Sequence, residues 1–327
     1  MDKRALLFRI GGLGDLLVAL PAISVLRRSL PGFLLTLVGR PEYTALLKRA
    51  GVVDETRSFE DARVAALFAT ADGGGLAPEW ARGYALAFGW LNRRGQWPGD
   101  SWWIRRGFER VMFASHESSG EAAVSRLFFD RTRRFFGREE IPEAAFDECA
   151  QLPLDDGLRT EALGHFSLAR LGPGERRLVV HPGSGGRRKC WPLENFLEVV
   201  RWAGSRGIGG VVVTGEAEAD WEPALAAAAL PEGWTWTARP PLAALAGLLA
   251  ESTHYLGNDS GPTHLAAACG ASVLALFAEG AGAAWRPFGR SRVLSAPAVD
   301  EIRVEVVLAE LGDFPAALGN PKTGLCR

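Results

Sequence analysis

The hydrophobic positions near the start of the chain form short apolar runs that alternate with helix-like stretches. Residues 5–10 predict a buried strand, and a glycine-rich turn over 11–15 leads into an apolar helix that reaches residue 30. Pro21 either ends or kinks that helix or restarts it as a first-turn residue. The same rhythm continues in three further elements, which are strands at 34–39 and 64–68 and a helix over 40–50. This order of elements is typical of a parallel sheet with right-handed crossovers.

The regular pattern is lost between residues 72 and 137. Five tryptophans fall between Trp80 and Trp103, and residues 101–138 hold eight arginines against four acidic residues. We expect a helix over 121–136 and interpret the region as a helical and aromatic insert in the first domain. Its arginines and aromatic rings suit an anionic acceptor or the surface of a bilayer, and a lid with a solvated basic face is the alternative.

The strand–helix rhythm restarts after a Pro-, Asp- and Gly-rich stretch at 151–173, which predicts a linker. The predicted strands are 178–181, 209–214, 253–257 and 271–277, and the predicted helices are 193–205, 220–230, 241–251, 262–269 and 299–311. We therefore expect two α/β domains, at 1–165 and 174–327, whose parallel sheets face an interdomain cleft. The last helix either closes the second domain or packs back on the first.

Composition narrows the class of protein further. The chain has 327 residues, of which 47% are apolar and 23% charged, and its net charge of −1 argues against nucleic-acid binding by bulk electrostatics. Its four cysteines are scattered, with no C-x-x-C pair, which suits a reducing cytoplasm. No uncharged apolar stretch of 18 residues occurs, so we expect a soluble cytoplasmic protein; peripheral contact with the inner membrane stays open.

The strongest motif is the run from 257 to 270, Gly-Asn-Asp-Ser-Gly-Pro-Thr-His-Leu-Ala-Ala-Ala-Cys-Gly. A strand ends at Gly257 and a helix begins near Pro262, so Ser260 and Gly261 place backbone N–H groups at the carboxyl edge of a sheet. That arrangement predicts a phosphate site. The alternative is an ordinary strand-to-helix turn in which Asp259 or Ser260 acts only as a cap.

A second glycine-rich loop, over 181–192, carries three consecutive cations: Arg187, Arg188 and Lys189. They can neutralise a diphosphate leaving group, although a solvated charged face is the alternative. In a third motif, Thr214–Asp220, the acidic side chains of Glu216, Glu218 and Asp220 suit ribose hydroxyls or helix capping.

The turn at 11–15 lacks the third glycine of a dinucleotide fingerprint, because Leu17 stands there. Asp15 instead lies at a helix start, where it can either take a proton from an acceptor hydroxyl or cap the helix. The chain contains no D-x-D pair, so a metal-bridged diphosphate has no obvious ligands.

Together these segments resemble glycosyltransferase family 9, the ADP-heptose:lipopolysaccharide heptosyltransferases. The resemblance covers the first 50 residues and about 177–290, and it implies the GT-B fold of two Rossmann-like domains. It implies that Asp15 is the catalytic base, with Gly12 and Gly14 on the acceptor side. The donor-binding residues that it implies are Ser184, Arg188, Lys189, Glu216 (with Glu218 as a competitor), Asp259, Ser260, Gly261, Thr263 and His264.

The activity that the resemblance implies is an inverting transfer of a sugar, with heptose expected, from an ADP-sugar to a lipopolysaccharide-core or related anionic glycan or glycolipid. Neither a metal nor a cofactor is expected beyond the nucleotide-sugar co-substrate. Other donors or acceptors, a GT-B nucleotide-sugar epimerase and a non-catalytic binding module are the alternatives. One departure concerns residues 183–186, Gly-Ser-Gly-Gly, where heptosyltransferases of the first type carry paired threonines.

Overall fold

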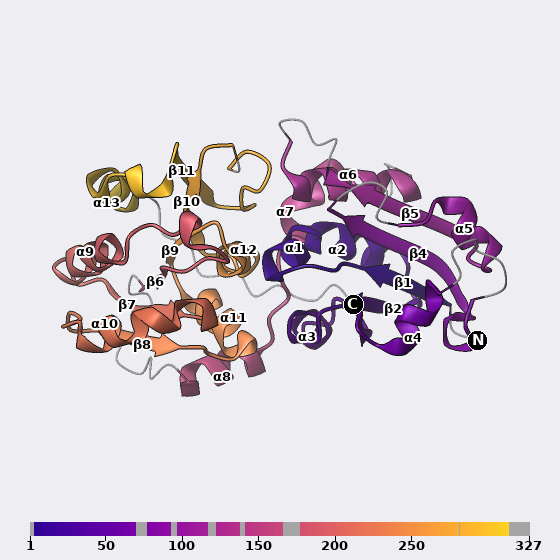
Figure 1. Cartoon of the computed structure of the whole chain (residues 1–327), viewed down its shortest axis with the longest axis horizontal. Helices are drawn as coiled ribbons and strands as arrows, with labels where there is room; N and C mark the ends of the chain where they lie inside the picture. Colours follow the sequence, from indigo (N-terminus) through magenta and orange to yellow (C-terminus); the bar gives the residue numbers. More distant parts are fainter. Residues whose placement is uncertain are drawn as a thin grey trace. The chain divides into compact units, whose positions relative to one another are not determined.

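The computed structural model describes residues 3–69, 77–92, 97–116, 122–137, 141–165, 177–280 and 282–313. The chain divides into two compact units, Met1–Leu152 and Pro153–Arg327. Each unit is an α/β layer structure, which confirms the predicted fold class (Figure 1).

The first unit is built on a parallel sheet, which has five strands among the described residues, in the order β3-β2-β1-β4-β5. The strands are β1 (Arg4–Phe8), β2 (Leu34–Gly39), β3 (Glu55–Ser58), β4 (Tyr84–Leu91) and β5 (Arg110–Ser115). Its helices are α1 (Leu13–Val18), α2 (Leu20–Ser29), α3 (Pro41–Arg49), α4 (Ala62–Leu67), α5 (Asp100–Arg105), α6 (Val124–Phe136) and α7 (Phe146–Cys149). Pro21 lies in the first turn of α2, so it restarts the helix, as one of the alternatives predicted.

The strand expected at 64–68 is wrong, because residues 64–67 belong to α4 and Phe68 is its C-cap residue. Asp61 caps this helix by accepting a hydrogen bond from the backbone N–H of Arg63 at 2.8 Å, and Val64 and Leu67 are buried on one face. The third strand of the chain is β3, which is partly exposed along its whole length. An edge strand without a fully buried face has no continuous apolar run for the sequence pattern to show.

The region interpreted as an insert also contains two strands of the sheet. β4 pairs with β1 on one side and with β5 on the other, and most of its residues are buried. The tryptophans belong largely to the core, since Trp90 and Trp103 are fully buried and Trp102 is 6% exposed. Burial rather than contact with a bilayer accounts for these three side chains.

Several of the arginines between 101 and 138 also have structural contacts. Arg106 is buried over the ring of Trp102, with its guanidinium carbon 4.1 Å from the ring centre. Arg126 forms an ion pair with Glu143, and buried Arg133 donates to the main-chain carbonyl of Ile141 at 3.0 Å. The basic character of this stretch is therefore partly satisfied within the unit.

The second unit has a six-stranded parallel sheet in its described part, in the order β11-β10-β9-β6-β7-β8. The strands are β6 (Arg177–His181), β7 (Gly209–Thr214), β8 (Trp234–Ala238), β9 (His254–Asn258), β10 (Ser272–Ala278) and β11 (Ser291–Ala296). Its helices are α8 (Asp156–His165), α9 (Leu193–Gly204), α10 (Glu222–Ala227), α11 (Leu242–Glu251), α12 (Gly261–Ala268) and α13 (Val304–Asp313).

The boundary between the units lies at Leu152, earlier than the expected domain end at 165, because α8 packs on α11. Gly247 permits this contact, since a Cβ there would lie 2.3 Å from the carbonyl oxygen of Leu158. At the other end of the chain, α13 packs against α9 and buries Val307 and Leu311 in the core of the second unit. The last helix thus closes the second unit.

Candidate functional site

Asp15 is held through both of its carboxylate oxygens in the turn that follows β1. The backbone N–H of Gly12 donates to Oδ2 at 2.9 Å, and Nη2 of Arg9 donates to Oδ1 at 2.9 Å. Gly12 is the N-cap residue of α1, and Asp15 lies at the third helical position, beside the half-exposed Gly14. By accepting the N–H of Gly12, Asp15 also caps this end of the helix, as one of the alternatives predicted. With 24% of its side chain exposed, the fixed carboxylate remains accessible.

Gly11 shapes this turn. Its φ of +148° disfavours residues with a side chain, and a Cβ there would lie 2.5 Å from Oδ2 of Asp15. The carboxylate therefore occupies the space that any larger residue at position 11 would need.

Arg9 is a site residue that the sequence motifs did not single out. It is 2% exposed, and it donates to the main-chain carbonyls of Asp15 and Trp90 at 2.6 and 2.8 Å and to Oδ1 of Asn92 at 2.9 Å. Burial lowers the pKa of Arg9 to about 10, and the carboxylate of Asp15 opposes that shift. The sequence did hold a signal for Arg9, because a cation directly after a buried strand needs polar partners in the fold.

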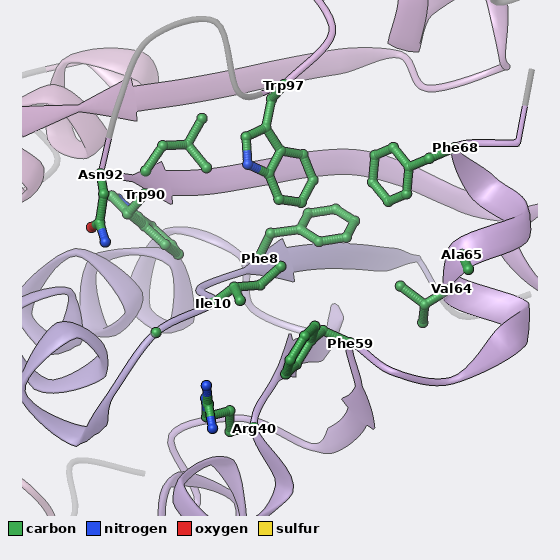
Figure 2. Close-up of a pocket in the computed structure, with 12 residues that line it drawn as sticks. Phe8, Ile10, Arg40, Phe59, Val64, Ala65, Phe68, Trp90, Asn92 and Trp97 are labelled. Atoms are coloured by element: carbon green, nitrogen blue, oxygen red, sulfur yellow. The ribbon is translucent and has the colours of Figure 1, made fainter. Parts of the chain in front are cut away.

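A cavity of about 640 Å³ opens at the same edge of the first sheet. Its walls come from the ends of β1 and β4 and from α4, with Phe8, Phe68 and Trp97 along its length and Arg40 and Asn92 toward its ends (Figure 2). Gly11 also lines it, so the cavity reaches the turn that carries Asp15.

In the second unit, the two glycine-rich loops are tied together by Asn258, which is fully buried at the end of β9. Its Oδ1 accepts from the backbone N–H of Trp191 at 3.0 Å, and its Nδ2 donates to the carbonyl of Pro182 at 2.6 Å. Ser184 donates from Oγ to the carbonyl of Asp259 at 2.6 Å. The loops that the sequence predicted separately therefore form one surface at the carboxyl edge of the sheet.

The start of α12 is fixed by hydroxyl groups rather than by a capping side chain. Ser260 is the N-cap residue of α12, yet its side chain makes no capping hydrogen bond to the helix backbone. The side chain of Asp259 does not cap the helix either. Thr263 donates from Oγ1 to the carbonyl of Asn258 and lies 3.1 Å from the hydroxyls of both Ser260 and Tyr255. Burial raises the pKa of Tyr255 above its usual value, so this hydroxyl stays protonated. Pro262 has no N–H, and the N–H of buried His264 donates to the carbonyl of Ser260 at 3.5 Å. The partly exposed Gly261 is therefore the residue of the first turn that offers its N–H to an outside acceptor.

The three consecutive cations have different surroundings. Nζ of Lys189 lies 2.6 Å from Oδ2 of Asp259, which joins the two loops. Arg187 pairs with Asp220 and lies over the ring of Trp221, with its guanidinium carbon 4.3 Å from the ring centre. Arg188 is exposed and has no hydrogen bond or ion pair within the described ranges. Of the three, Arg188 has the guanidinium that is open to an anion.

Glu216 and Glu218 differ in their exposure to solvent. Glu216 is exposed, whereas Glu218 is 3% exposed and accepts from the backbone N–H of Gly215 at 2.7 Å. Oε2 of Glu218 lies 3.8 Å from Nε2 of His181, and burial raises the pKa of Glu218 while it lowers that of His181 to about 4. Glu218 is thus part of the scaffold, and Glu216 is the side chain that remains open to a ligand.

A family model described as "Glycosyltransferase family 9 (heptosyltransferase)" matches residues 112–300, which is more than half of the chain. The chain is a member of glycosyltransferase family 9. The resemblance stated from the sequence motifs is therefore confirmed, and the chain is a glycosyltransferase.

Individual family 9 proteins are distant relatives. Lipopolysaccharide heptosyltransferase 3 of Escherichia coli is 27% identical over 135 residues, and the match spans only 38% of this chain and 38% of that protein. The solved structure of E. coli ADP-heptose lps heptosyltransferase II has a TM-score of 0.72 at 17% identity and covers 94% of this chain and 97% of its own. A family 9 glycosyl transferase from Veillonella parvula has a TM-score of 0.70 at 16% identity, with 98% and 95% covered. These likenesses confirm the GT-B fold.

The residues predicted for family 9 chemistry fall into two groups. Asp15, Gly12 and Gly14 lie together in the first unit, and the nine donor-side residues lie on the joined loops and neighbouring turn of the second.

Within the described residues, no group of three or more His, Cys, Asp or Glu side chains is arranged to hold a metal ion. No helix in the same part of the chain is long and apolar enough to cross a membrane.

Proposed function

We propose that this protein transfers heptose from ADP-heptose to a lipopolysaccharide-core or related glycan acceptor, with inversion at the anomeric carbon and without a metal ion. The proposal rests on membership of family 9 and on the names of the similar proteins, which are heptosyltransferases of lipopolysaccharide. The structural observation that carries the proposal is the joining of the two glycine-rich loops, through Asn258 and through the Lys189–Asp259 pair.

The joined loops suit a nucleoside diphosphate. The start of α12 presents the backbone N–H of Gly261, and the exposed guanidinium of Arg188 can pair with phosphate oxygens in a bidentate manner. Lys189 supplies a second cation, although it must share its charge with Asp259. Glu216 is placed on the adjacent turn, where a carboxylate can accept hydrogen bonds from ribose hydroxyls.

Asp15 activates the acceptor in this mechanism. Its carboxylate takes the proton of the attacking hydroxyl as the new bond forms to the anomeric carbon, and the bond from that carbon to the β-phosphate oxygen breaks. Each carboxylate oxygen already accepts one hydrogen bond and keeps lone-pair capacity for a further proton. Arg9 and Gly12 keep the carboxylate in one orientation, which a general base requires.

Stabilisation of the departing ADP falls to positive charge and helix N–H groups in a metal-free reaction. Metal independence is a point to test, because one similar structure, TibC from enterotoxigenic E. coli, is described as an iron-containing glycosyltransferase. Its TM-score is 0.51 at 15% identity, and the match covers 64% of that longer chain. Transfer measured in the presence and absence of a strong chelator decides this point.

The proposed function is tested by incubating the protein with ADP-heptose and lipopolysaccharide-core acceptor and by measuring ADP release and product mass. Product heavier by one heptose, with ADP released in equal amount, supports the proposal.

A thermal-shift panel of ADP, UDP, GDP and CMP identifies the base of the donor, since a ligand at 100 times its Kd adds about 2.7 kcal/mol of stability. Stabilisation by UDP or GDP and not by ADP would refute an ADP-sugar donor.

A nucleotide-sugar epimerase is the second candidate, because the fold is also similar to that of a UDP-GlcNAc 2-epimerase from Neisseria meningitidis. That likeness has a TM-score of 0.52 at 10% identity over 94% of this chain and 90% of the other. An epimerase needs no acceptor, so conversion of the donor sugar in an acceptor-free reaction would favour this second function.

For a transferase that acts on a lipopolysaccharide acceptor, we propose a cytoplasmic location with peripheral contact at the inner membrane.

A further inference from the structure

The cavity of the first unit is lined mainly by apolar side chains. Nine of the twelve residues that form its walls are apolar, and five of those nine are aromatic. Phe59, Phe68 and Trp97 turn their rings toward the space, with Phe8 along the middle of it (Figure 2). A volume of about 640 Å³ is enough for a group of drug-like size.

The polar side chains of the cavity are few, and they supply N–H groups. Arg40 is about half exposed near one end, and Trp97 brings an indole N–H. Asn92 accepts from Arg9 through Oδ1, which leaves its amide nitrogen as the donor (Figure 2). A sugar ring buried here would place several hydroxyls against aromatic walls, and each hydroxyl left unpaired costs about 1–3 kcal/mol.

The cavity also lies next to the group that would activate the acceptor. Gly11 lines it, and the Cβ position of Gly11 is 2.5 Å from Oδ2 of Asp15. Ile10, which is 36% exposed, stands between this turn and the aromatic walls. An acceptor whose hydroxyl approaches Asp15 therefore has the apolar space beside it.

We propose that this cavity binds an apolar group, an acyl chain or an aromatic ring, which the acceptor carries beside the hydroxyl that receives the sugar. The inference rests on the proposed transferase function and deepens it, because it names the chemistry of the acceptor. The apolar group displaces water from the aromatic walls, while Asn92 and Trp97 donate to the atom that links the group to the rest of the acceptor.

The proposal is tested by calorimetric titration of the full-length protein with alkyl β-glucosides from methyl to hexyl, all below their micelle-forming concentrations. Each buried methylene should tighten binding by about fourfold until the cavity is filled. Phenyl β-glucoside, which has the same number of carbons in its apolar group as the hexyl compound, distinguishes an aromatic occupant from an acyl chain. Tighter binding of the phenyl compound identifies the aromatic ring, and tighter binding of the hexyl compound identifies the chain.

Two matched variants of α4 show whether binding occurs in this cavity. Ala65 is exposed and lines the cavity, whereas the neighbouring Ala66 is also exposed and does not line it. Ala65→Glu brings a charge into the apolar space and should weaken hexyl glucoside binding at least tenfold, while Ala66→Glu should bind like the wild type. Both positions face solvent, so neither variant should change the unfolding temperature by more than a few degrees.

Equal affinity for methyl and hexyl glucosides, or equal weakening by Ala65→Glu and Ala66→Glu, would overturn the proposal. ADP binding is measured on the same samples and reports separately on the transferase function. A protein that binds hexyl glucoside in the cavity but binds no nucleotide would keep the apolar site and refute the transferase proposal. A protein that binds ADP but whose glucoside affinity does not depend on alkyl length would keep the transferase proposal and refute the apolar site.

Discussion

Arg9 contacts Asp15 twice, from Nη2 to the carboxylate Oδ1 at 2.9 Å and from Nε to the main-chain carbonyl at 2.6 Å. The same guanidinium also reaches the carbonyl of Trp90 at the end of β4. One buried cation thus fixes the carboxylate relative to two neighbouring strands. The position of the proposed base is therefore set by the core of the first unit rather than by the turn alone.

Replacing Asp15 by Asn should lower turnover by a factor on the order of 10² to 10⁴, because the amide cannot accept the hydroxyl proton. ADP affinity should stay unchanged, since the proposed donor residues lie in the other unit. Turnover is measured by ADP release and affinity by calorimetry. Asp300→Asn, at an exposed position in the second unit, is the control and should turn over like the wild type. Full activity of Asp15→Asn would remove Asp15 from the mechanism.

Gly11→Ala should abolish most of the activity by displacing the carboxylate of Asp15. The new Cβ would lie 2.5 Å from Oδ2, and the φ of +148° adds backbone strain. Gly32→Ala is the matched control, because Gly32 also has a positive φ, +78°, but has no atom within 4 Å of its Cβ position. Both variants should lose about 1–3 kcal/mol of unfolding free energy, and only Gly11→Ala should lose turnover. Equal turnover in the two variants would show that Asp15 tolerates displacement.

Arg188→Gln should weaken ADP binding by roughly 10- to 100-fold, because a charge-assisted hydrogen bond to a phosphate contributes roughly 1.5–3 kcal/mol. Arg187→Gln is the control in the same loop, and it should change the affinity by less than about threefold, since Arg187 is already paired with Asp220. The affinities are compared by calorimetry at low and high salt. A larger loss in Arg187→Gln than in Arg188→Gln would assign the phosphate contact to the other arginine.

Stability should depend on pH through His181, whose pKa burial lowers from 6.5 to about 4. Between these two values the unfolded chain binds a proton that the folded chain does not, so unfolding becomes easier as the pH falls from about 6.5 to 4. The loss approaches about 3 kcal/mol and stops below pH 4. The raised pKa of Glu218 acts in the opposite direction, because the folded state takes up that proton first.

His181→Gln separates these two effects in denaturant unfolding measured at pH 7 and at pH 4. The variant lacks the histidine proton, so acidification should destabilise it less than the wild type by about 3 kcal/mol. The same acid sensitivity in both proteins would mean that His181 is not the group responsible.

Local sequence patterns gave the right structure where burial is uniform and turns are marked by glycine or proline. Residues 34–39 and 209–214 were predicted as strands and are β2 and β7 with the same bounds, because continuous apolar runs of that length fit strands buried on both faces. Residues 64–68 show the limit of the same reasoning. A short apolar run fits a strand or a helix, and here the cap at Asp61 and the core beneath α4 favour the helix.

The strands β4 and β5 escaped prediction for a different reason. Their segments lie among tryptophans and arginines, which suggested a surface insert, and only the pairing of β4 with β1 shows that the aromatic rings fill a core. The edge strands β8 and β11 consist mostly of partly or fully exposed residues and carry a weak pattern. Such positions depend on partners that are distant in sequence.

The sequence by itself determined the α/β class, the two glycine-rich loops and the turn that bears Asp15, because glycine, proline and apolar runs act on the backbone within a few residues. The tertiary structure alone decided how those parts are held. Asn258 joins loops 67 residues apart, and Arg9 reaches a carbonyl 81 residues away. It also decided that Glu218 is buried while Glu216 is exposed, since burial depends on the packing of the whole unit. The turn at 258–264 was predicted as an anion site from its residues, and the pairing of Arg187 and Lys189 with carboxylates leaves Arg188 as the cation proposed for that anion.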